Sequence, residues 1–201
     1  GITPLDDTLR QEKTGLMFAP ILFYTPDTRW SIGAAGLSAF RLKEKTDSIA
    51  NTRMSYLKFL GIYTLNKQFD SEMSWNIFTP QERFLIKGEV RFRSFPDRCY
   101  GIGNQTLESN EELYSYNLLR FNTLFMRKIG RNFFAGLDYE FEKEYNFKYT
   151  EDGVLESGNV YGYNGGIGSA LGLVALHDNR DNILNAYSGW YAELSSYYFA
   201  P

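Results

Sequence analysis

The sequence is poor in the residues that carry covalent cross-links and metal sites. Its one cysteine, Cys99, excludes an internal disulfide, and its one histidine, His177, leaves few ligands for zinc. The net charge of −3 is too balanced to indicate a nucleic-acid partner. No apolar run approaches the ~20 residues that a membrane-spanning helix needs. We therefore expect no metal, no other cofactor and no nucleic acid.

Proline is also scarce, with 6 residues, whereas glycine reaches 18 and aromatic residues make up 17% of the chain. Abundant Tyr and Phe suit extended strands better than helices. The mean hydropathy of −0.36 is nevertheless typical of a soluble protein. A membrane β-barrel reconciles the two observations, because it places its apolar side chains at every second position of each strand.

Two segments, residues 82–93 and 132–145, alternate cleanly between apolar and charged side chains. A helix would scatter these two sets around its circumference, whereas a strand separates them onto opposite faces. The apolar sets are Phe84, Ile86, Gly88, Val90 and Phe92 in the first segment, and Phe133, Ala135, Leu137, Tyr139 and Phe141 in the second.

Seven further segments follow the same period of two less cleanly, so that we expect about nine strands. They cover roughly residues 14–24, 28–42, 52–65, 68–78, 112–128, 161–177 and 188–200. Most exceed the ~5–6 residues that are usual in soluble sheets, and they fit the ~9–11 that a tilted membrane strand needs. Residues 1–13 are polar and aperiodic and are expected to form a flexible leader, while residues 14–201 form one all-β domain.

The connections between the expected strands differ in length. Residues 94–113 and 150–162 are long and fall on odd-numbered connections, whereas two even-numbered ones, residues 79–82 and 130–132, are short. Outer-membrane barrels show this asymmetry, although two other even-numbered connections are longer. The fold class predicted is an antiparallel transmembrane β-barrel with its charged faces towards the lumen. A soluble sandwich, with the apolar faces in its core, is the alternative.

Three stretches carry a family resemblance: FAPILFYTPDTRWSIGAAG at residues 18–36, FPDRCYGIGN at 95–104, and LGLVALHDNRDN with SGWYAEL at 171–194. Together they resemble the BamA/TamA-like outer-membrane barrels, or bacterial surface-antigen family, in the form found in Bacteroidetes-type bacteria. The motif residues are Asp178, Arg180, Asp181, Asn182 and Gly189 in the last stretch, Tyr100, Gly101, Gly103 and Asn104 in the middle one, and Pro26, Thr28, Trp30 and Gly33 in the first.

The resemblance implies a non-enzymatic protein of the bacterial outer membrane that contacts lipid and assists protein assembly or translocation. Client outer-membrane proteins or other assembly subunits would be its partners. The family's barrels have more strands than this chain offers, so we expect a partial barrel, the N-terminal part. The family's POTRA domains and its lumenal V-R-G-F motif are absent from this sequence. The candidate seam strand carries Phe18, Pro20, Leu22 and Tyr24.

The segment around His177 invites other interpretations. A lipid hydrolase would use His177 and Asp178 with Ser188 or Ser169 as nucleophile, but no nucleophile-elbow motif is present. Calcium could bind the carboxylate and amide oxygens of this connection, but their spacing is not that of an EF-hand, and Arg180 is cationic. A structural polar turn is favoured, because Asp and Asn side chains cap turn backbone and Arg can bridge carboxylates.

The glycines of Tyr100–Asn104 superficially suggest a phosphate-binding loop. The third glycine of that motif is missing, and neither a buried strand before it nor a helix after it is predicted. We interpret these glycines as allowing tight packing in a long loop, with Cys99 a passive thiol. A passive pore or ligand-binding barrel, an outer-membrane lipid hydrolase using His177 and a soluble β-sandwich remain the alternatives for function.

Overall fold

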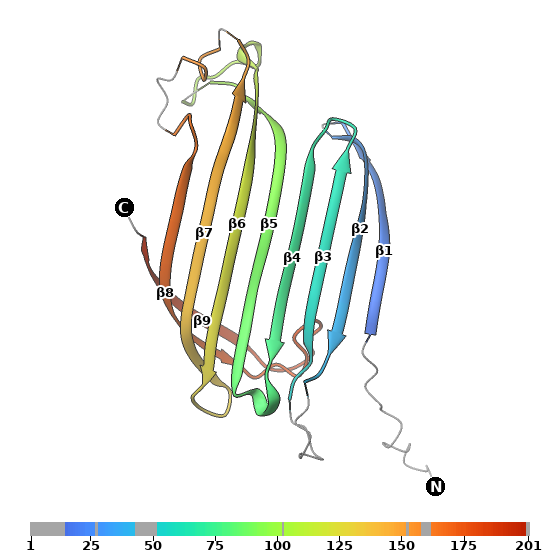
Figure 1. Ribbon diagram of the computed structural model, residues 1–201, viewed down its shortest axis with the longest axis vertical. Coiled ribbons are helices and arrows are strands. Elements are labelled where there is room, and N and C mark those ends of the chain that lie inside the picture. Colours follow the sequence, from blue (N-terminus) through green and yellow to red (C-terminus); the bar gives the residue numbers. More distant parts are fainter. Residues whose placement is uncertain are drawn as a thin grey trace.

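The computed structural model describes residues 15–26, 28–42, 52–101, 103–151, 153–157 and 162–199. Within these ranges, nine strands form one antiparallel sheet whose spatial order follows the sequence (Figure 1). The strands are β1 Gly15–Thr25, β2 Arg29–Phe40, β3 Ser55–Thr64, β4 Phe69–Phe78, β5 Phe84–Cys99, β6 Glu112–Lys128, β7 Phe133–Tyr149, β8 Gly166–Asp178 and β9 Tyr191–Phe199. The predicted all-β, antiparallel meander is thereby confirmed.

The predicted barrel, of which this chain was expected to form a part, is not confirmed, because the sheet does not close within the described ranges. Among the described residues, β1 pairs only with β2 and β9 pairs only with β8, so the sheet is open at both edges. Two short 3-10 turns, η2 Pro80–Glu82 and η3 Glu108–Asn110, interrupt the connections. No helix in the described ranges is long and apolar enough to cross a bilayer. The leader predicted for residues 1–13 lies outside the described residues.

Strand β5 is longer than the predicted segment 82–93 and includes residues that were expected to form a loop. It stays paired with β6 as far as Cys99, whereas its pairing with β4 ends at Ser94. Pro96 is tolerated in this extension because its carbonyl and its ring nitrogen point to the same side of the strand. That side faces away from β6, where pairing with β4 has already ended. There, the Pro96 carbonyl accepts a hydrogen bond from Gln68 Nε2 at 3.4 Å.

Strand β8 begins later than predicted. The glycine-rich stretch before it forms a turn in which Gly162 and Gly165 have φ angles of +83° and +84°. A Cβ at Gly165 would lie 2.1 Å from the carbonyl oxygen of Glu144, so no larger residue fits there without rearrangement. The turn therefore delays the strand to Gly166.

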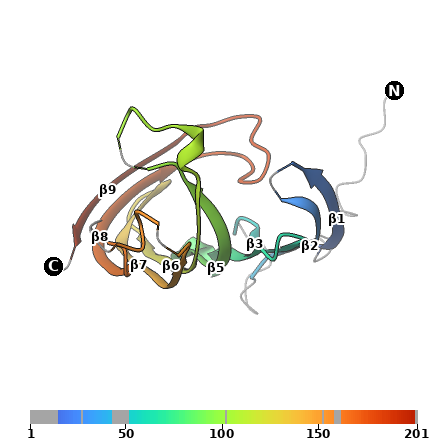
Figure 2. The same cartoon turned by 90° about the horizontal axis from the view of Figure 1, so that it is seen from above.

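The sheet is curled, and contacts between distant strands show which face is concave. Lys87 on β5 donates a hydrogen bond to the Tyr191 hydroxyl on β9 at 2.9 Å and lies 3.3 Å from the Glu193 carboxylate. Three strands separate β5 from β9 in the sheet, so these side chains meet across the hollow. The Tyr197 hydroxyl of β9 reaches Asp138 of β7 over Gly172 of β8, which has no side chain to block it. The view from above shows the curl from β5 to β9 (Figure 2).

An apolar cluster fills the concave face near the lower ends of the strands in Figure 1. Phe78 and Phe134 are fully buried within it, and their rings meet edge-on with centroids 6.3 Å apart. Ile183, from the connection between β8 and β9, packs against the same cluster. Its buried members are Phe78, Leu85, Leu124, Met126, Phe134, Val174 and Leu176.

The convex face is apolar and exposed. By the register, the described strands place every Asp and Glu on the concave face, and the only charged residues on the convex face are Arg98, Arg127, Lys143 and Lys148. The large side chains exposed on the convex face include Leu16, Phe18, Leu22, Trp30, Ile32, Phe59, Tyr63, Met73, Phe125, Leu137, Ile167, Leu171, Leu173, Leu194 and Tyr198. The sheet thus encloses its charges and displays its apolar side chains.

Candidate functional site

The connection between β8 and β9 contains the main predicted motif and begins with a closed ion pair. Asp178 is the last residue of β8 and is only 2% exposed. The Nε and Nη2 atoms of Arg180 donate to its two carboxylate oxygens at 2.9 and 3.1 Å, and the Arg180 backbone N–H donates to Oδ1 at 3.2 Å. This two-point contact uses the planar fork of the guanidinium and fixes the first residues of the turn.

The other motif residues bind the turn backbone rather than one another. Asp181 Oδ1 accepts hydrogen bonds from the N–H groups of Asn182, Tyr187 and Ser188 at 3.0, 3.1 and 3.2 Å. These bonds, that from Ser188 foremost, hold the pKa of Asp181 below its ordinary value. Asn182 Oδ1 accepts N–H groups of the two residues that follow Ile183. The predicted Asp178–Arg180–Asp181 group therefore divides in two: Arg180 holds Asp178, and backbone donors hold Asp181.

Gly189 closes the turn at its far end. Its φ of +94° lies in the left-handed region, and a Cβ there would lie 2.4 Å from the carbonyl oxygen of Asn179. Close approach is needed because Asn179 and Trp190 exchange two bonds: the Asn179 N–H donates to the Trp190 carbonyl at 3.2 Å, and the Trp190 N–H donates to Asn179 Oδ1 at 2.6 Å. Only glycine combines this backbone angle with this proximity.

Three charged residues outside the motif complete a network at this end of the sheet. Arg53, just before β3, lies 3.1 Å from Asp178 Oδ2 and 3.0 Å from Glu82 Oε1, while Lys128 Nζ lies 2.8 Å from Glu82 Oε2. The Arg53 guanidinium also covers the ring of Phe78 at 4.3 Å from its centroid. The network thus joins the starts or ends of β3, β5, β6 and β8 over the apolar cluster.

Glu82 is the acidic centre of this network and is 6% exposed. Burial by itself would raise its pKa, but the hydrogen bond from Lys128 and the charge of Arg53 bring the pKa below its ordinary value. Sequence reasoning missed Arg53, Glu82 and Lys128. Each is an isolated charge beside a strand end, and only the curl of the sheet brings the three together.

His177 lies apart from this network. It precedes Asp178 on β8, so its ring projects from the opposite, convex face. There it stacks on Trp190 with centroids 4.1 Å apart and meets the edge of Phe133 at 4.5 Å. Ser169, a candidate nucleophile, donates a hydrogen bond to the Tyr139 hydroxyl at 3.2 Å. It lies about 26 Å from His177 along β8, at ~3.3 Å per residue. His177, Asp178 and Ser169 are therefore not brought together in the form that a triad needs.

The carboxylates that the calcium interpretation would use as ligands already have other partners in this turn. The carboxylate of Asp178 faces two guanidinium groups, those of Arg53 and Arg180. Asp181 is occupied by backbone donors, as described above. In the part of the chain that the structure describes, no group of three or more His, Cys, Asp and Glu side chains is placed to hold a metal ion.

The glycine-containing loop lies at the other end of the sheet, after β5 (Figure 1). Gly101 and Gly103 have φ angles of +101° and +110°, as expected for a sharply turning loop. The Gly101 N–H donates to Cys99 Sγ at 3.4 Å, which gives this thiol a local structural contact. The remaining motif residues, Tyr100 and Asn104, are exposed.

The candidate seam strand is an edge strand in this structure. Phe18, Pro20, Leu22 and Tyr24 lie on the convex face of β1 and are exposed. Tyr24 meets Trp30 of β2 edge-on, with ring centroids 5.7 Å apart. The residues predicted for the seam thus share one face and one free edge of the sheet.

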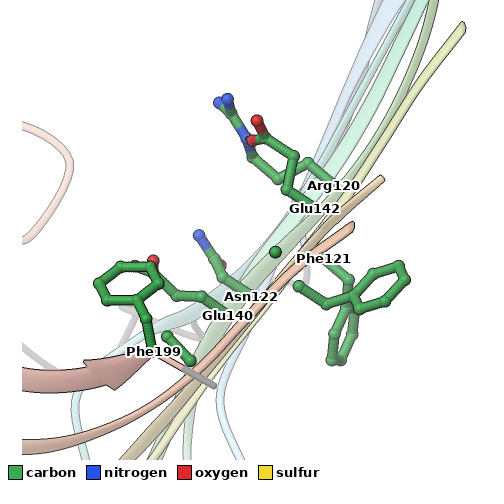
Figure 3. Close-up of a pocket in the computed structure, with 9 residues that line it drawn as sticks. Arg120, Phe121, Asn122, Glu140, Glu142 and Phe199 are labelled. Atoms are coloured by element: carbon green, nitrogen blue, oxygen red, sulfur yellow. The ribbon is translucent and has the colours of Figure 1, made fainter. Parts of the chain in front are cut away.

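The middle of the concave face carries cross-strand ion pairs. Arg91 Nε donates to Asp70 Oδ1 at 2.9 Å, and Arg120 Nε donates to Glu142 Oε2 at 2.6 Å. Figure 3 shows Arg120 and Glu142 on the concave side, with Phe121 projecting from the opposite side. The cavity drawn there has a volume of about 380 Å³. Arg120 and Glu142 are 43% and 41% exposed, so solvent screens their attraction and the pair contributes little to the free energy of folding.

Comparison of the chain with protein families, with curated proteins and with solved structures finds no match.

Proposed function

We propose that this chain forms part of the wall of a bacterial outer-membrane β-barrel and acts as a non-enzymatic scaffold of the BamA/TamA type in protein assembly or translocation. The observation that carries the proposal is the direction of the curl. The concave face holds the acidic side chains of the strands, and the convex face exposes large apolar side chains such as Phe125, Leu137 and Leu173.

A soluble sheet would be expected to curl the other way. Water-soluble proteins bury their apolar faces in a core and turn their charges to solvent, because removal of apolar surface from water drives folding. In a membrane barrel the outer surface meets lipid and the lumen is polar. The two faces of this sheet follow the second arrangement along most of its width, with Arg120–Glu142 inside and Phe121 outside (Figure 3).

Aromatic side chains at one end of the convex face fit the same proposal. Tyr24 and Trp30 flank the turn between β1 and β2, and Tyr63 lies at the end of the neighbouring β3; all three are about half exposed. Rings with a polar edge are favoured where the hydrocarbon layer meets water. We therefore place this end of the sheet near a membrane interface.

The open edges indicate how the barrel would be completed. Unpaired N–H and C=O groups cannot face hydrocarbon without a large cost, so β1 and β9 both need partner strands. Eight antiparallel steps separate these strands, so they run in the same direction and would form a parallel seam if paired directly. Fully antiparallel closure requires an odd number of additional strands between them. The free edge of β1 is then the seam at which an incoming strand would be templated, as the family resemblance suggests.

Membrane placement can be tested with single cysteines in a Cys99→Ser background. Leu137→Cys probes the convex face and Glu140→Cys probes the concave face of the same strand. We expect a fluorophore at position 137 to be quenched by a quencher in the lipid phase, and the thiol at position 140 to react with a membrane-impermeant maleimide. The reverse pattern, or release of the protein by alkaline carbonate without detergent, would overturn the proposal.

Assembly activity needs a separate test. A disulfide that locks the β1 edge to its neighbour in the completed barrel should stop the insertion of outer-membrane proteins, and reduction should restore it. Unchanged insertion by the locked barrel would exclude a templating role for this edge while leaving the membrane placement intact. Conductance in planar bilayers without any effect on assembly would favour the passive-pore alternative.

A further inference from the structure

The concave face is not uniform, and its β1–β3 part differs from the charged wall that follows. The inward side chains of β1 and β2 between their ends are Met17, Ala19, Ile21, Gly33, Ala35 and Leu37. Since the convex side of β1 is also apolar, this strand is apolar on both faces. Such a pattern is typical of a strand that is covered on both sides, not of one whose inner face meets water.

The apolar part of the concave face is hollowed into a cavity of about 400 Å³. Met17, Leu37 and Leu60 contribute its larger apolar side chains, and the small side chains of Ala19 and Ala35 leave the space between them. The wall is thus a slot of hydrocarbon character within an otherwise polar concave face. An acyl chain would cover this surface and remove it from water.

One cation lies at this cavity without an acidic partner among the described residues. The ammonium of Lys58 is placed over the Tyr56 ring, 4.7 Å from its centroid, and Lys58 is exposed. The nearby acid of the cavity wall, Glu72, lies 3.9 Å from the Arg91 guanidinium on the side away from β3. An ammonium beside an apolar slot suits a ligand with an anionic head and a hydrocarbon tail.

We propose that this cavity binds a fatty acid, with the acyl chain along Met17, Ala35 and Leu37 and the carboxylate at Lys58. The inference rests on the proposed function, because it takes the concave face as the lumenal face of the barrel. It assigns a lumenal ligand to the strands beside the free edge, separate from the lipid that contacts the convex face.

The test uses the full protein in phosphatidylcholine nanodiscs and a palmitic acid that carries a photoactivatable diazirine near the end of its chain. After illumination, labelled residues are mapped by mass spectrometry. We expect concave labels at Met17 and Leu37, together with convex labels from the surrounding bilayer at Leu22 and Ile32, which do not line the cavity. Ala35→Trp should abolish the concave labels by filling the cavity, whereas Ala34→Trp, on the convex face of the same strand, should preserve them.

The head group is tested with the methyl ester of the same probe. The ester should label the concave residues about tenfold less than the acid, because it lacks the charge that Lys58 binds. Lys58→Gln should remove this preference, and Lys143→Gln should keep it. Lys143 is a matched control: it lies over the Tyr145 ring at 5.3 Å, but on the convex face.

Each outcome bears on one of the two proposals. Convex labels without concave labels would overturn the fatty-acid site and leave the membrane placement standing. This is the result expected if a protein segment fills the cavity instead. Absence of labels from both faces would overturn the membrane placement itself. Equal concave labelling by acid and ester would overturn the assignment of the carboxylate to Lys58.

Discussion

Arg53 and Asp178, which are 125 residues apart in the chain, form an ion pair with 3.1 Å between Nη1 and Oδ2. The same Nη1 atom donates to the Asp178 backbone carbonyl at 3.2 Å. The pair ties the start of β3 to the end of β8 across the curl of the sheet. The pair therefore depends on the curvature of the sheet, because flattening the sheet would separate the two residues.

Removal of Arg53 should be strongly destabilising. Arg53→Met would leave the nearly buried carboxylates of Asp178 and Glu82 with fewer partners, and breaking a buried pair from one side costs about 3 kcal/mol. Arg120→Met breaks the exposed pair with Glu142 and should cost less than ~1 kcal/mol. Denaturant unfolding in detergent micelles measures both free energies. Equal losses in the two variants would show that the Arg53 network does not hold the strand ends together.

Gly189→Ala should destabilise the β8–β9 connection. The new Cβ would meet the Asn179 carbonyl at 2.4 Å in a left-handed backbone, and we expect a loss of about 2 kcal/mol or more. Gly168→Ala is the control, because a Cβ at Gly168 would meet nothing within 4 Å. The midpoint of denaturant unfolding should fall for the first variant and stay nearly constant for the second. An unchanged midpoint in Gly189→Ala would contradict the tight closure at Asn179.

The stability of the fold should depend on pH through Glu82. Its folded-state pKa lies below the ordinary value of 4.5, so its ionised form stabilises the folded state at pH values above that ordinary value. This contribution is lost as the pH falls through the lowered, folded-state pKa. The free energy of unfolding should therefore decrease on acidification from pH 5 downwards, and Glu82→Gln should weaken that dependence. A variant that keeps the full acid dependence would assign it to other carboxyl groups.

Replacement of His177 should affect packing rather than chemistry. His177→Ala removes the ring between Trp190 and Phe133, and we expect a loss of about 1 kcal/mol together with a change in tryptophan fluorescence. Hydrolysis of phospholipid by the unaltered protein and the variant is the accompanying assay. A lipase activity that disappears with His177 would refute the non-enzymatic proposal.

Strand positions and faces could be predicted from the sequence because a period of two reports directly on which side chains share a face. Residues 84–92 and 133–141 alternate so cleanly that the sequence predicts both strands, and the Asx residues together with Gly189 predict a polar turn at Asp178–Asn182. The extension of β5 could not be read in the same way. It depends on continued pairing with β6, which no alternation within residues 94–99 indicates.

The sequence by itself determined the period, the division of β5 and β7 into an apolar and a charged face, and the polar turn after β8. Only the tertiary structure decided which face is concave, because curvature arises from the twist and register of all strands together. That curl brings Arg53, Glu82, Lys128 and Asp178 into one network and sets Lys58 beside an apolar cavity on the inner wall. No local pattern contains this information, since residues that meet there are neighbours in space across a bent sheet and not along any strand.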